Sequence, residues 1–119
     1  MLLNQVNIIL TADVNIWAIE KDNSIKLLLL LVTEALSADN FHISENHNLD
    51  VRSVRLFKKD DSLISAYIYT YGQLEERYGL HLEFPFHNEM DISSSMDIYE
   101  GISFKTLVDL LSVHFDLTV

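Results

Sequence analysis

The sequence predicts an α+β fold, in which an antiparallel β-meander of four or five strands is packed on one face by two or three helices. Apolar residues recur at helical spacing around residue 30 and again near the C-terminus. Between these segments, residues 41–84 alternate short β-rich stretches with polar turns. With only one proline and three glycines there is little room for linkers, so residues 1–119 are expected to form a single domain.

Two helices are expected to flank the meander. The first is predicted to run to about Ser37 with Asn23 or Ser24 as its N-cap, and the apolar run 27–32 indicates burial around its whole circumference. The second is predicted to begin after Ser103, its N-cap, with Ile102 able to pack on the first turn. Its apolar stripe is Phe104, Leu107, Val108, Leu111 and Phe115, which leaves Lys105 and Asp109 in solvent.

The N-terminal region gives a weaker pattern. Residues 5–10 alternate apolar and polar side chains, apart from Ile9, and this predicts a strand buried on both faces. Residues 11–20 fit either a helix or a strand. Thr11 and Asp13 are suitable first residues of a helix and favour that interpretation.

Four β-rich segments occupy the middle of the chain: Phe41–Asn46, Val51–Phe57, Leu63–Tyr71 and Tyr78–Phe84. Residues 38–40, 58–61 and 72–77 carry turn-forming side chains, and the short connections predict antiparallel pairing. Residues 91–96 are serine-rich and are expected to form a surface loop.

The charge of the chain is strongly acidic, with 18 carboxylates against 8 basic residues and a net charge of −10. From residue 78 to residue 104 there is no lysine or arginine, while this stretch carries Glu83, Glu89, Asp91, Asp97 and Glu100. Such a surface repels nucleic acids and anionic membranes and attracts basic proteins or cations. A basic protein partner is therefore expected.

The segment Leu63–Tyr71 separates two kinds of side chain by parity. Ile64, Ala66 and Ile68 share one side of the strand, and Tyr67, Tyr69 and Tyr71 share the other. If the aliphatic side meets the helices, the tyrosines stand in a row on the outer face, where Ser53, Arg55 and His81 are candidate neighbours. Tyrosine and arginine are enriched at binding hot spots, although ordinary cross-strand packing also accounts for such a row.

No catalytic, cofactor or metal signature accompanies these features. The sequence lacks a glycine-rich phosphate loop and a nucleophile elbow, and it has no cysteine for disulfides or thiolate chemistry. His81 and Glu83 point to the same side of a strand, but a zinc site would need further ligands such as His42 or His87. No signal peptide is predicted, and the longest apolar run of six residues is too short for a membrane span, so a cytoplasmic protein is expected.

The acidic meander, the segment "YGLHLEFPF" with the acidic loop after it, and the terminal helix "ISFKTLVDLLSVHF" are similar in architecture to bacterial immunity proteins. The family is that of polymorphic toxin and contact-dependent growth inhibition systems. The resemblance implies a cytoplasmic protein without cofactors that neutralises one cognate toxin, often a nuclease, by binding on or near its active site. The residues expected to bind the partner are Tyr67, Tyr69, Tyr71, Glu83, Glu89 and Asp91.

Other functions remain open at this point. An acidic secretion chaperone would share the small size and low isoelectric point, and it would expose large apolar patches for an unfolded client and dimerise. A small enzyme using His81 and Glu83 is a further alternative, as is a structural or oligomeric subunit. The sequence leaves the oligomeric state open.

Overall fold

A computed structural model describes residues 16–44, 49–85 and 96–117. Its elements, in chain order, are η2 (Ile16–Ala18), α1 (Asn23–Leu36), η3 (Ala38–Asn40), β2 (Phe41–Ile43), β3 (Ser53–Lys58), β4 (Asp61–Tyr69), β5 (Tyr78–Glu83), β6 (Met96–Ile102) and α2 (Phe104–His114). The five strands form one sheet in the order β2-β3-β4-β5-β6, and all neighbours are antiparallel. The predicted α+β meander is confirmed.

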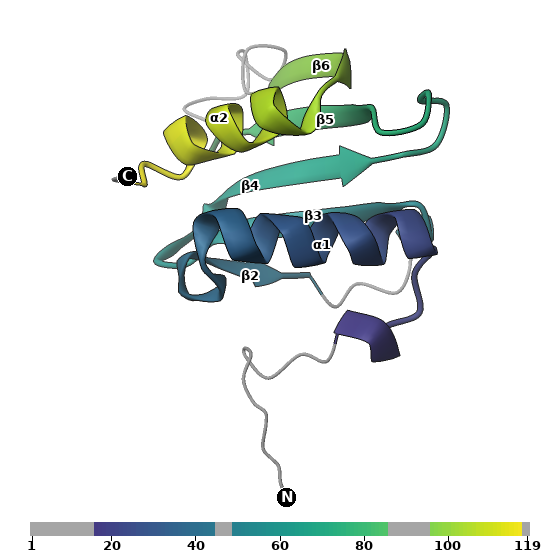
Figure 1. The fold of residues 1–119 in the computed structure, drawn as a ribbon. Helices are drawn as coiled ribbons and strands as arrows, with labels where there is room; N and C mark the ends of the chain where they lie inside the picture. Colours follow the sequence, from purple (N-terminus) through teal and green to yellow (C-terminus); the bar gives the residue numbers. More distant parts are fainter. Residues whose placement is uncertain (1–15, 45–48, 86–95, 118–119) are drawn as a thin grey trace, which may run out of the picture.

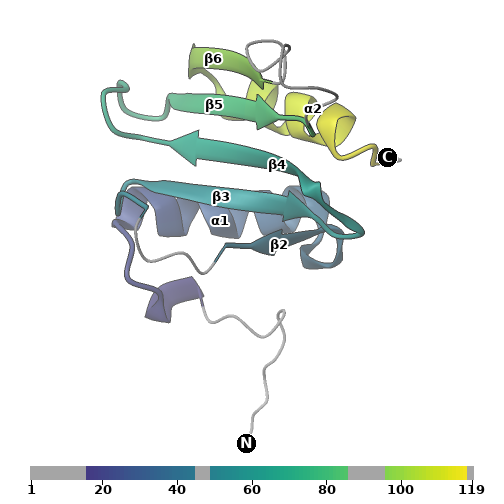
Figure 2. The same cartoon turned by 180° about the vertical axis from the view of Figure 1, so that it is seen from behind.

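Both α-helices lie on the same face of the sheet. Figure 1 shows α1 along β3 and α2 beside β5 and β6, and Figure 2 shows the opposite face, which carries neither helix. The core fills the space between the helices and this one face. Its fully buried members include Leu28, Leu29 and Val32 of α1, Leu107 and Leu111 of α2, and Val54, Leu56, Ala66, Ile68 and Leu80 of the strands.

Helix α1 begins one residue earlier than Ser24, and its N-cap is Asp22 rather than Asn23 or Ser24. The Asp22 carboxylate accepts a 2.9 Å hydrogen bond from the backbone N–H of Ser24, and the Asp22 N–H donates to the carbonyl of Val51. This second bond fixes Asp22 at the cap position. The expected burial all round the helix is also wrong, because Leu27 is 53% exposed and Leu31 44% exposed.

The strand boundaries shift by a few residues from the predicted ones. In the described residues the first strand ends at Ile43, and β3 starts at Ser53 because Asp50 forms a turn that accepts from the N–H groups of Arg52 and Ser53. The predicted hairpin turn over residues 58–61 is confirmed, with Lys58 ending β3 and Asp61 opening β4. The strand expected at residues 5–10 lies outside the described residues.

Strand β6 was not anticipated from the sequence, and Met96, expected in a loop, is its first residue; residues 91–95 lie outside the described ranges. Its alternation is interrupted by a bulge. Tyr99 pairs with Leu80 and Ile102 with Tyr78, so β6 has one more residue than β5 between these two pairs. Gly101 takes the positive φ of 67° that this bulge requires.

Helix α2 follows directly and confirms its prediction. Ser103 is the N-cap, with its Oγ accepting from the N–H of Thr106, and Lys105 and Asp109 are exposed and paired at 2.9 Å. The segment 11–20 is helical only over Ile16–Ala18, as a single 3₁₀ turn, within the part that is described. None of the described helices has the length and apolar character needed to cross a membrane.

Candidate functional site

The candidate site is the sheet face without helices, called here the open face. It is formed by the residues opposite in parity to the core: Ser53, Arg55, Ser65, Tyr67, Tyr69, His81, Glu83, Met96, Ile98 and Glu100. The register places Tyr67 between Arg55 of β3 and His81 of β5, and it pairs Tyr69 with Ser53. The predicted neighbours of the tyrosine row are therefore confirmed.

The three tyrosines form a compact cluster rather than a row of separate side chains. Tyr69 stacks on Tyr71 with 4.6 Å between ring centroids, and it lies 5.7 Å from Tyr67. The hydroxyls of Tyr67 and Tyr71 meet at 3.1 Å. Tyr69 is consequently only 3% exposed, whereas Tyr71 is 38% exposed. Tyr67 and Tyr71 are thus the members that a partner can touch, with Tyr69 as their support.

Tyr69 also reaches across β5 to the edge strand β6 on the open face. Its ring lies over Gly79 of β5, where a Cβ atom would stand 2.0 Å from Tyr69 Cζ. Its hydroxyl donates a 2.7 Å hydrogen bond to Glu100 Oε2 on β6. Burial, this bond and the Glu100 charge all raise the pKa of Tyr69. The bond to Tyr67 and burial raise the pKa of Tyr71 to about 12, so both phenols stay neutral.

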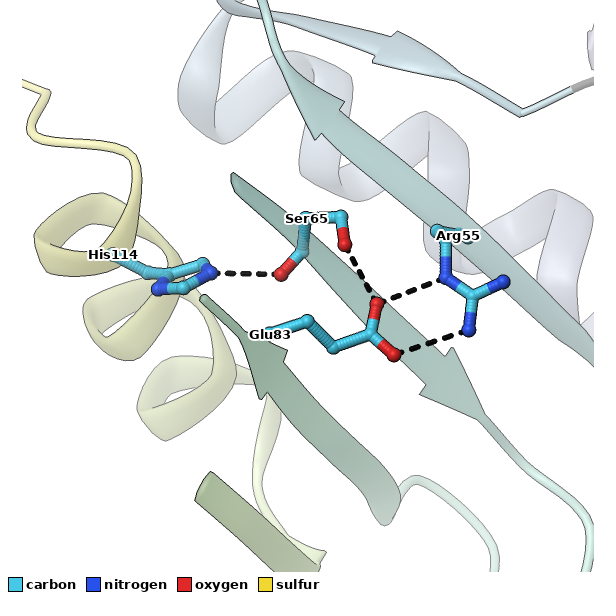
Figure 3. A network of polar contacts seen from close by, with 4 residues as sticks. All are labelled: Arg55, Ser65, Glu83 and His114. Atoms are coloured by element: carbon cyan, nitrogen blue, oxygen red, sulfur yellow. Dashed lines mark hydrogen bonds and ion pairs between the residues drawn. The ribbon is translucent and has the colours of Figure 1, made fainter. Parts of the chain in front are cut away.

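Glu83 is held by two neighbours instead of standing free. Figure 3 shows its carboxylate accepting from Arg55 Nε at 2.9 Å, from Arg55 Nη2 at 3.1 Å and from Ser65 Oγ at 2.6 Å. Burial raises the pKa of Glu83, but the bonds from Arg55 and Ser65 with the Arg55 charge outweigh it and lower the pKa. The Arg55 guanidinium also lies 5.1 Å from the Tyr67 ring centroid. Glu83 therefore orients Arg55 against the cluster.

The same network continues through the sheet to α2. His114, which is only 9% exposed, lies with Nε2 2.7 Å from the Ser65 carbonyl oxygen, as Figure 3 shows. A carbonyl can only accept, so Nε2 carries the proton and donates. His114 Nδ1 has no hydrogen-bond partner among the described residues. One sequence signal points to this residue: it occupies an inward position, three residues after the buried Leu111.

Of the acidic residues expected to bind a partner, Glu89 and Asp91 lie outside the described residues. Asp97 and Glu100 lie on β6 and are exposed. Both belong to the acidic stretch for which a basic partner is expected, but neither is among the six residues expected to bind that partner.

The enzyme and metal alternatives depend on His81 and Glu83, which do share the open face. Both Glu83 oxygens are already engaged by Arg55, and the His81 ring packs 5.5 Å from Tyr67 and 5.4 Å from Tyr69. Within the described ranges, no three His, Asp or Glu side chains converge as metal ligands would. A surface hollow does occur at the β3–β4 turn, but it includes neither His81 nor Glu83. Its lining residues are Asn40, Lys58, Lys59, Asp60, Phe115, Asp116 and Leu117.

No protein-family model and no curated protein matches this chain, and no solved structure matches its fold. A fold alone does not define a function, because one architecture serves many activities. The function is therefore inferred from the chemistry of the open face.

Proposed function

We propose that this protein binds another protein through the open face and thereby neutralises it, as an immunity protein does for a cognate toxin. The partner is a toxin with a basic surface, such as a nuclease, whose active site the open face covers. The observation that carries the proposal is the tyrosine cluster, held in place on a sheet face that neither helix covers.

The cluster has the properties of a binding hot spot. Tyrosine and arginine dominate such sites because each combines a large contact area with a polar group. The hydroxyl contact between Tyr67 and Tyr71 and the Glu83 bonds to Arg55 fix these side chains before any partner arrives. Preorganised side chains lose little conformational entropy on binding, so more of the contact energy appears as affinity.

Charge favours a basic partner. The chain carries a net charge of −10, and the stretch from residue 78 to residue 104 has no basic residue. A nuclease holds phosphates in a positively charged cleft, which complements such a surface and accelerates association. Glu89 and Asp91 keep their expected role as partner contacts, and Glu83 contributes through Arg55.

A secretion chaperone is the second candidate, and exposed apolar side chains on the same face favour it. Met96 is 37% exposed and Ile98 60% exposed, and both point away from the helix layer. A chaperone would hold an extended apolar segment of an unfolded client against these residues. The two candidates differ in whether the partner is folded and active before it binds.

The test captures partners from an extract of the native host with the tagged protein. Tyr67→Ala and Tyr71→Ala are run in parallel with Val113→Ala, a matched control because Val113 is 81% exposed on α2, on the opposite side of the molecule. Circular dichroism verifies that each variant is folded. Any captured protein is then purified, and its own activity is measured with and without one equivalent of this chain.

The proposal expects one basic partner, bound equally by the wild type and Val113→Ala. Loss of a hot-spot tyrosine should weaken binding by about 30-fold, equivalent to about 2 kcal/mol. The purified partner should lose its activity in the complex. Equal binding by all variants, or a partner that stays active when bound, contradicts the proposal. Capture of several unfolded clients supports the chaperone instead.

A further inference from the structure

Among the described residues, strand β6 is the longer of the two edges of the sheet. It spans the seven residues Met96–Ile102, whereas β2 at the other edge has only three. One side of β6 pairs with β5, and no described strand pairs with the other side. Backbone N–H and C=O groups along such a side are unpaired and can accept a further strand.

Of the features that usually protect an edge, this one has two carboxylates and a bulge but no lysine or proline. Proteins block free edges with lysine, with proline or with bulges, and β6 contains neither lysine nor proline. Its bulge lies at the C-terminal end, where the Gln73 side chain accepts a 2.7 Å hydrogen bond from the Gly101 N–H. The remaining part of the strand, from Met96 to Tyr99, keeps a regular register with β5.

Contacts on both faces of the sheet anchor β6. Tyr99 and Ile102 pack against the core from the helix side, and Glu100 accepts the hydroxyl bond of Tyr69 on the open face. An incoming strand would therefore meet a formed template. It would also extend the open face directly, because Met96 and Ile98 belong to both surfaces.

Charge identifies the occupant. Asp97 pairs with the inward Leu82 and so lies on the helix side, while Glu100 lies on the open face, and both are exposed. A second copy of this chain would bring a second set of these carboxylates against the first, which destabilises cross-strand pairing. A strand with lysine or arginine at the matching positions, three residues apart, would gain two favourable pairs instead.

We propose that β6 accepts an extended basic segment of the partner as a sixth strand, with two cations three residues apart opposite Asp97 and Glu100 and apolar residues beside Ile98. This inference rests on the proposed function for the identity of the partner. The kind of segment that β6 accepts does not depend on the proposed function, because it follows from the unpaired edge and its two carboxylates.

The test uses a synthetic peptide, so it does not depend on finding the toxin. The peptide has the length of β6 and consists of valine and threonine with two lysines three positions apart. One matched peptide carries glutamates in place of the lysines. A second keeps the lysines but has alternate backbone amides N-methylated, which removes strand pairing and leaves the charge unchanged. Binding is followed by NMR shifts and amide exchange of this protein.

We expect the basic peptide to shift and protect amides of Met96–Glu100, and both matched peptides to bind about tenfold more weakly or not at all. Ile98→Lys should weaken the basic peptide similarly. Leu63→Lys adds the same charge at an exposed apolar position of β4, away from the edge, and should leave binding nearly unchanged.

Four results would overturn the proposal. Equal binding of the N-methylated peptide would mean that only charge attracts the peptide. Protection at β2 instead of β6 would place the docking elsewhere. Protection of β6 amides that disappears on dilution without peptide would make a second copy the occupant. If the basic peptide does not bind β6 while capture of a folded partner still depends on Tyr67, the edge proposal is wrong and the proposed function is unaffected.

Discussion

The Tyr69 hydroxyl reaches Glu100 across an intervening strand, joining β4 to β6 above β5 by a 2.7 Å hydrogen bond. Gly79 makes this possible, because it pairs with Tyr69 in the register and has no side chain to block the ring. An aromatic ring laid over a glycine of the neighbouring strand is a known way to stabilise such a position. The edge strand is thereby connected to the centre of the sheet.

Replacing Tyr69 by Phe should remove this connection while keeping the ring. We expect the free energy of unfolding to fall by about 1 kcal/mol, because one hydrogen bond to a carboxylate that is itself solvated is lost. Urea denaturation measures the change. Tyr71→Phe is the matched control, since it removes only the contact with the Tyr67 hydroxyl at the surface, and it should cost less. Equal losses in the two variants would contradict the assigned role of Glu100.

Replacing Gly79 by Ala should destabilise the fold by about 1–3 kcal/mol, because the new methyl group collides with the Tyr69 ring. The same substitution made in a Tyr69→Ala background should cost much less, since the colliding ring is gone. Gly72→Ala is a control for backbone strain alone, as Gly72 has a φ of 72° and no atom near its Cβ position. Additive effects of the two substitutions would show that the ring does not cover Gly79.

The stability of the wild type should depend on pH through Glu83. Its pKa is lowered in the folded state, so near its ordinary pKa of about 4.3 the unfolded chain binds more protons than the folded one. The stabilisation is therefore complete above that pH and is lost as the pH falls through the lower, folded pKa. The stability difference between wild type and Glu83→Gln should shrink in acid. Denaturation curves from neutral to acidic pH check this, with Asp109→Asn as an exposed ion-pair control.

Replacing His114 should reveal the polar contact between α2 and β4. His114→Leu leaves the Ser65 carbonyl without its donor and should cost about 1–3 kcal/mol. His114→Gln should recover part of this loss, because its amide nitrogen can stand in for Nε2. Thermal unfolding followed by circular dichroism compares the two. If leucine and glutamine are equivalent, packing against Phe84 and Phe115 is what the histidine contributes.

The sequence was sufficient where side-chain periodicity is simple. The alternation in Leu63–Tyr71 correctly separated core from open face, and the apolar spacing after Ser103 correctly defined α2. Strand β6 was not predicted because the bulge at Gly101 places Tyr99 and Ile102, three residues apart, on the same side and so breaks the alternation. The α1 cap was misplaced because Asp22, Asn23 and Ser24 are all good caps, and the deciding bond comes from the distant Val51.

The candidate site was predictable in composition but not in connectivity. Parity alone placed Tyr67 and Glu83 on their strands' outer faces. Whether Glu83 stands free depends on the registers of β3, β4 and β5 together, which bring Arg55 and Ser65 to its oxygens. The burial of Tyr69 likewise depends on Tyr71, which lies beyond the end of β4 and stacks on the Tyr69 ring.

The order of the strands also has a kinetic consequence. Each strand pairs with its neighbour in sequence, so the sheet can form one hairpin at a time, starting from the tight β3–β4 turn. Topologies dominated by such local contacts fold quickly. The bond from Tyr69 to Glu100 spans 31 positions and can form only once β5 is in place. We therefore expect β6 to join the sheet late in folding, after β5.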